Sequence, residues 1–269
     1  MRSERSRSLN LVTLVTALAA CGLIVATNAV WPVAALVAGA TAVGTFLLLA
    51  ELDPRGVPVE ALATPVVAAG ALTGLAAFVG VGALSLPLLA TGAVLVGAAL
   101  TLERRLLGPA DATHSRARQQ LMPFTVLLAF VGFAAVAASV PGGLVEPQTG
   151  QQGAGGLDEG GLLVLALADG LIAFLLGYRL AALQAPSIIE AAWAAGTFAV
   201  VVGAGAALLR AVALPRLVGP AILAAIFYLW AAYRQASGAE RRSEGWLWEY
   251  LALAGAAALA VAWNLLLRR

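Results

Sequence analysis

Long apolar runs separated by short polar segments occupy almost the whole chain. Nine of these runs reach about 20 residues, the length at which a helix crosses the hydrocarbon core of a bilayer. They cover residues 9–28, 33–50, 62–82, 84–102, 121–140, 161–182, 186–209, 215–233 and 247–267. The pattern predicts an all-α, polytopic integral membrane bundle of about nine transmembrane helices, in a single domain over residues 1–269 with short loops and no soluble domain.

One long apolar stretch has to be divided to give this count. Residues 64–102 are apolar almost throughout, and one helix of that length would be nearly twice as long as the ~30 Å hydrocarbon core is thick. Gly80, Gly82 and Ser85 lie just before Pro87, which is a residue typical of the first turn of a helix. We therefore expect the chain to turn back near residue 83.

The composition supports the membrane class. The chain is 61% hydrophobic and 11% charged, with a mean hydropathy of +0.93, whereas soluble domains carry roughly 25% charged residues. Every basic residue is Arg, and the usage of Ala, Gly and Arg without Lys is typical of a GC-rich bacterial genome.

Residue counts exclude several kinds of chemistry. Without Lys the chain can form no Schiff base and has no catalytic lysine. The single Cys21 excludes a disulfide within the chain, and the single His114 excludes a haem or copper site with two histidine ligands from this chain. We find no Gly-x-Ser-x-Gly elbow, no His-Glu-x-x-His motif and no paired aspartate motif, and we predict neither a cofactor nor a metal site.

The arginines predict the orientation of the chain. If the N-terminus is cytoplasmic, 12 of the 16 basic residues lie on the cytoplasmic side, as the positive-inside rule expects for a plasma membrane protein. Residues 1–8 then form an Arg-rich cytoplasmic tail, residues 103–120 a basic cytoplasmic loop and residues 141–160 a Gly-rich extracytoplasmic loop. The four exceptions fall late in the chain, which leaves an eight-helix arrangement open: Arg210, Arg216, Arg268 and Arg269.

Asp169 is an acid near the middle of a membrane-length apolar run. Small residues recur beside it at helical spacing, at Ala166, Gly170, Ala173 and Gly177, and such stripes allow close helix packing. Asp169 should therefore face the bundle, either as a protonated group in an interhelical hydrogen bond or as part of a pathway or cavity. Its candidate hydroxyl partners are Thr73, Thr91, Thr125 and Thr197.

Arg179 and Glu190 complete the set of candidate polar sites. They lie at similar distances before and after a predicted hairpin turn near Pro186, and so at similar depth on antiparallel helices. We expect an ion pair or a shared water cluster between them near the cytoplasmic interface, with a structural role preferred over a catalytic one.

The residues before Cys21 resemble the lipobox of bacterial lipoproteins, in which the cysteine is lipidated. Leu18, Ala19 and Ala20 precede Cys21 after an Arg-rich leader. The apolar run continues beyond Cys21, which favours an ordinary first transmembrane helix over lipidation.

These patterns favour a non-enzymatic scaffold or auxiliary subunit of a membrane complex. Its partners would be the lipid bilayer and other membrane subunits, reached through small-residue helix faces such as Gly70-x-x-x-Gly74 and Gly203-x-Gly205. A small-solute or proton-coupled transporter using Asp169 is the first alternative, and a membrane enzyme acting on a lipid-like substrate is the second. The few loop arginines do not support nucleic-acid binding.

Overall fold

The described part of the chain is helical throughout. The computed structural model describes residues 2–25, 30–51, 56–79, 85–108, 112–140, 159–211 and 218–236, with four single positions at 248, 252, 255 and 259, and these residues contain no strand. The helices are α1 (Arg2–Val25), α2 (Val30–Ala50), α3 (Ala63–Val79), α4 (Ser85–Leu107), α5 (Ala112–Ser139), α6 (Glu159–Ala182), α7 (Ile188–Ala211) and α8 (Val218–Gln235), and a short 3₁₀ helix, Val59–Leu62, leads into α3.

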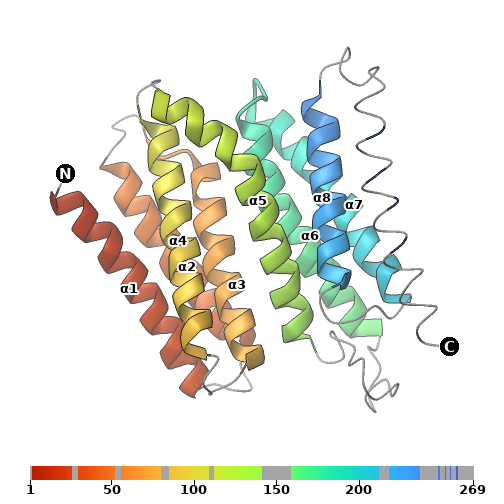
Figure 1. The fold of residues 1–269 in the computed structure, drawn as a ribbon, viewed down its shortest axis with the longest axis horizontal. Coiled ribbons are helices and arrows are strands. Elements are labelled where there is room, and N and C mark those ends of the chain that lie inside the picture. The colour runs from red at the N-terminus through yellow and green to blue at the C-terminus, as the bar shows by residue number, and fades with distance from the viewer. Residues whose placement is uncertain are drawn as a thin grey trace.

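Successive helices run in alternate directions, as Figure 1 shows, so that each packs antiparallel to the next. The first eight predicted apolar runs each overlap one of these helices. Six described helical segments are long and apolar enough to cross a membrane, which agrees with a helical membrane protein. The ninth predicted helix, 247–267, lies outside the described residues except for the four single positions, so the count of nine stays a prediction.

The segment predicted as a basic loop, 103–120, is mostly helical. α4 continues to Leu107, and α5 already begins at Ala112. α5 contains Pro123, which removes one backbone hydrogen bond and bends a helix, and Figure 1 shows its first part turned across the end of the bundle. The predicted apolar run ended at residue 102 because charged residues follow it, but α4 continues through them to Leu107. Residues 141–158 of the predicted Gly-rich loop lie outside the described residues.

The backbones of α6 and α7 approach each other closely. A β-carbon added to Gly170 would lie 3.2 Å from the carbonyl oxygen of Ala199, and one added to Gly203 would lie 3.1 Å from that of Ala166. Ala173 on the same face of α6 is fully buried. The small-residue stripe predicted on α6 therefore packs against α7, where it allows the van der Waals contact that holds helices together in lipid.

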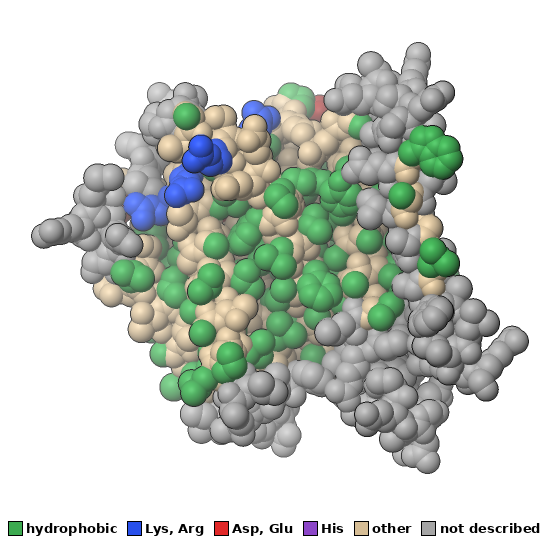
Figure 2. Space-filling model, in the orientation of Figure 1, with side chains coloured by type: hydrophobic (Ala, Val, Ile, Leu, Met, Phe, Trp, Pro, Cys, Tyr) green, Lys and Arg blue, Asp and Glu red, His purple; other side chains and the backbone are tan. Residues whose placement is uncertain are grey.

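Large apolar side chains divide between the interior and the surface. Phe133 and Phe227 are fully buried, whereas Val94, Leu167 and Trp193 are more than 60% exposed. Figure 2 shows that apolar side chains cover the middle of one face, with arginines gathered toward one end. This distribution fits a bundle whose girdle faces lipid.

We predict that alanine has opposite effects at two glycines of α7. Gly203→Ala should lower the free energy of unfolding by about 1–2 kcal/mol, because its β-carbon meets a backbone carbonyl that can yield only if the helices separate. Gly196→Ala should raise it by about 0.5–1 kcal/mol, because alanine favours the helix and nothing lies within 4 Å of its β-carbon. Unfolding of the purified variants by SDS in mixed micelles measures both changes, and equal effects would contradict the close approach.

Candidate functional site

A buried ion pair joins three helices near one end of the bundle. Thr64 at the start of α3, Glu103 in the last turns of α4 and Arg179 near the end of α6 form this group, called here the Glu103 cluster. The Arg179 and Glu103 side chains are 5% and 0% exposed, and Thr64 is fully buried. These three groups are therefore removed from both water and lipid.

The Glu103 carboxylate accepts hydrogen bonds from three donor groups in this cluster, and one of these, the Nε–H of Arg179, is shared between its two oxygens. Arg179 Nε lies 3.0 Å from each carboxylate oxygen, and Arg179 Nη2 lies 2.6 Å from Oε2. The Thr64 hydroxyl donates to Oε1 over 2.6 Å. Each carboxylate oxygen therefore accepts from the shared Nε–H and from one further donor, and neither oxygen is left without a partner. This satisfaction is what makes a buried charge tolerable.

The expected ion pair between Arg179 and Glu190 is not formed, because Arg179 binds Glu103 instead. Arg179 follows Leu176 by three residues on the buried face of α6. Glu190 lies in the first turn of α7 and is exposed. Arg179 is buried and Glu190 is exposed, so the two side chains do not face each other.

Glu103 and Thr64 were missed as site residues. The helical spacing contained a signal for Glu103, because it follows Val96 and Ala99 at intervals of seven and four residues, and all three are buried. Arg104 and Arg105 directly after it suggested a loop. Thr64 carried no signal of its own, since a threonine at the start of a helix is common.

Asp169 lies within α6 and is 1% exposed, as its position beside the small-residue stripe predicted. Ten residues separate it from Arg179, or about 15 Å along a helix, so it does not belong to the Glu103 cluster. The four candidate hydroxyls each donate to a carbonyl three or four residues earlier in their own helix: Thr73 to Ala69, Thr91 to Pro87, Thr125 to Met122 and Thr197 to Ala194.

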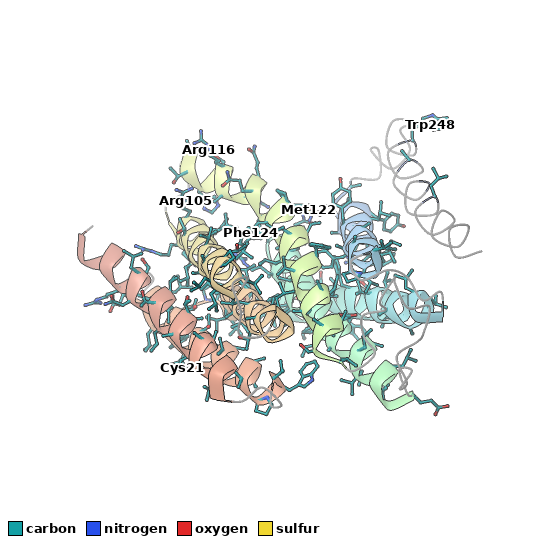
Figure 3. All side chains as sticks on the ribbon, turned by 60° about the horizontal axis from the view of Figure 1, so that its bottom comes forward. Cys21, Arg105, Arg116, Met122, Phe124 and Trp248 are labelled. Carbon is teal, nitrogen blue, oxygen red and sulfur yellow. The ribbon has the colours of Figure 1, made fainter. Side chains whose placement is uncertain are left out.

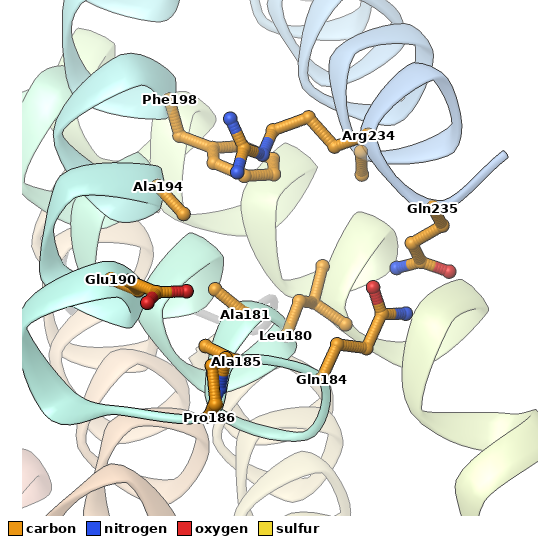
Figure 4. A pocket seen from close by; sticks show the side chains of 11 residues that line it. Leu180, Ala181, Gln184, Ala185, Pro186, Glu190, Ala194, Phe198, Arg234 and Gln235 are labelled. Carbon is orange, nitrogen blue, oxygen red and sulfur yellow. The ribbon is translucent and has the colours of Figure 1, made fainter. Parts of the chain in front are cut away.

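An open cavity of about 230 Å³ lies between the α6–α7 turn and the end of α8 (Figure 4). Its polar lining comes from Gln184 in the turn, Glu190 on α7, and Arg234 and Gln235 on α8, and its apolar wall includes Leu180, Ala194, Phe198 and Ala231. Figure 4 shows Arg234 reaching from α8 toward the side on which α7 lies, with the Glu190 carboxylate on that side. Asp169 and the Glu103 cluster do not line it.

The arginines of α4 and α5 lie apart from Cys21. Figure 3 shows Arg105 and Arg116 where α4 meets α5. Cys21 lies away from them, near the C-terminal end of α1. Cys21 is exposed and free, and α1 continues unbroken through it to Val25. Arg118 donates to the carbonyl of Leu183 over 3.3 Å, which ties the start of α5 to the α6–α7 turn.

Among the residues that the structure describes, no group of three or more His, Cys, Asp or Glu side chains is placed to hold a metal ion. Comparison with protein families, with curated proteins and with solved structures finds no match to this chain. The class defined by the helices is that of a helical membrane protein.

We predict that the losses of unfolding free energy caused by two replacements in the Glu103 cluster do not add. Glu103→Leu or Arg179→Met alone should lower the free energy of unfolding by about 3–5 kcal/mol, because each leaves the other charge buried and unpaired. The double variant should lose less than either single variant, since no charge remains buried. SDS unfolding of the three purified variants provides the measurement.

The ion pair between Arg7 and Glu51 is the control, because both side chains are more than half exposed. Arg7→Met should change the free energy of unfolding by at most about 1 kcal/mol. Additive losses in the double variant of the Glu103 cluster would show that the two charges are not coupled.

Proposed function

We propose that the chain is a multi-pass, non-enzymatic membrane protein that acts as a scaffold or auxiliary subunit of a membrane assembly. Its place would be the plasma membrane, with the N-terminus in the cytoplasm. The observation that carries the proposal is the complete use of the buried charges of the Glu103 cluster. Both oxygens of the Glu103 carboxylate are held by the buried donors Arg179 and Thr64, so this charge supports packing rather than contact with a substrate.

The position of the cavity supports a packing role over transport. A proton or solute pathway through Asp169 would have to bring water to that carboxyl group. Among the residues of α6 that line the cavity, Leu180 is the nearest to Asp169 along the chain, and it lies 11 residues beyond Asp169, or about 16 Å along the helix. Asp169 itself lies beside the close contact between α6 and α7.

The outer face of α4 is suited to contact with another membrane helix. Ala90, Thr91, Val94, Ala98 and Thr101 are exposed there at helical spacing, and four of the five are small. The hydroxyls of Thr91 and Thr101 bond to carbonyls of their own helix at 2.8 and 2.7 Å. This surface is therefore smooth and internally satisfied, as close helix association in lipid requires.

We expect Ala98→Trp to release the protein from its membrane assembly. The bulky ring would hold a partner helix away from α4, so that most of the protein should move from a larger complex to the free form. Native gel electrophoresis of mild-detergent extracts, with the protein at its natural level, measures the change.

Ala204→Trp is the matched control, because Ala204 is exposed on α7 rather than on α4, and it should leave the complex intact.

Purified wild-type protein in vesicles with an entrapped pH dye should pass protons no faster than protein-free vesicles. A proton flux that follows the gradient and is abolished by Asp169→Asn would contradict the scaffold proposal and show that the protein transports protons.

A further inference from the structure

The cavity beside the α6–α7 turn carries two opposite charges on different helices. Glu190 comes from the first turn of α7 and Arg234 from the last turn of α8, and both are exposed. Among the described residues, neither forms an ion pair, in contrast to Arg179 and Glu103. Both charges are therefore available to a molecule that enters the cavity.

The remaining lining combines polar and apolar side chains. The amides of Gln184 and Gln235 belong to it, and each can donate and accept hydrogen bonds. Phe198 and Leu180 form part of the apolar wall, and both are buried. A molecule suited to this lining has a small charged head and an apolar remainder.

The aromatic side chains around the cavity fit a position at the level of lipid headgroups. Trp193, one turn after Glu190, is 76% exposed, and Trp230 stacks on Tyr233 with ring centroids 5.6 Å apart, directly before Arg234. Exposed Trp and Tyr side chains are typical of the membrane–water interface. Headgroups of the surrounding lipid would thus be within reach of the cavity.

We propose that this cavity binds a zwitterion that carries a primary ammonium and a phosphate, supplied as the headgroup of phosphatidylethanolamine. The guanidinium of Arg234 donates paired hydrogen bonds to the phosphate, and the carboxylate of Glu190 accepts those of the ammonium. A volume of about 230 Å³ is below the roughly 300–1,000 Å³ of pockets for drug-sized ligands, so it admits the headgroup and the adjoining start of the acyl chains against the apolar wall, and the rest of the chains stay outside.

The same chemistry disfavours the other common phospholipids. Phosphatidylglycerol brings an anion without a cation, which leaves Glu190 opposite a negative charge. Phosphatidylcholine has no N–H group to donate to Glu190, and its trimethylated head is larger. The site is therefore selective for the amine, and that selectivity depends on Glu190.

Native mass spectrometry of the full-length protein in detergent, titrated with each of the three lipids, tests the proposal. Phosphatidylethanolamine should bind most tightly. Arg234→Gln should weaken the binding of phosphatidylethanolamine about tenfold, which is the effect of losing a charge-assisted hydrogen bond. Glu190→Gln should reduce the preference for phosphatidylethanolamine over phosphatidylglycerol by a similar factor.

Arg105→Gln is the matched control, because Arg105 is exposed on α4 and does not line the cavity, and it should bind all three lipids as the wild type does. Soluble phosphoethanolamine distinguishes the source of the headgroup, and binding as tight as that of the lipid would overturn the lipid assignment. Equal binding of the three lipids, or unchanged binding in both Glu190→Gln and Arg234→Gln, would overturn the proposal as a whole.

Discussion

The buried pair of Glu103 and Arg179 constrains the rest of the bundle. Two charges can remain away from water only if their hydrogen-bonding positions are filled and their geometry is held, because each unpaired charge would cost several kcal/mol. Meeting that condition fixes the end of α4, the end of α6 and the start of α3 relative to one another. The consecutive helices α3 and α4 are thereby placed in register with α6, which comes later in the chain.

Elsewhere the helices are held by contact rather than by charge. Lipid removes most of the hydrophobic force between helices, so close approach of backbones takes its place. Gly170 and Gly203 provide that approach between α6 and α7, and Gly74 provides it between α3 and α5, where an added β-carbon would lie 2.9 Å from that of Ala135. α6 takes part in both kinds of interaction and so connects the charged end of the bundle to the packed middle.

Much of the fold followed from the sequence because membrane-length apolar runs are a strong signal, and the first eight runs each overlap a helix. The burial of Asp169 also followed, since a stripe of small residues marks a packed face. The partner of Arg179 did not follow. Glu103 lies 76 residues away, and no local spacing reports which helices meet in the bundle. The charges after Glu103 also suggested a loop, although Glu103 shares the buried face of α4 with Val96 and Ala99.

The separation of 76 residues between Glu103 and Arg179 has a consequence for biosynthesis. A ribosome makes α4 well before α6, so Glu103 must enter the membrane region without its cation. Its place four residues before the end of α4 keeps it about 6 Å from the helix end, close enough for its side chain to stay in contact with interfacial water. The ion pair that fixes α3 and α4 relative to α6 can therefore form only after α6 has been synthesised.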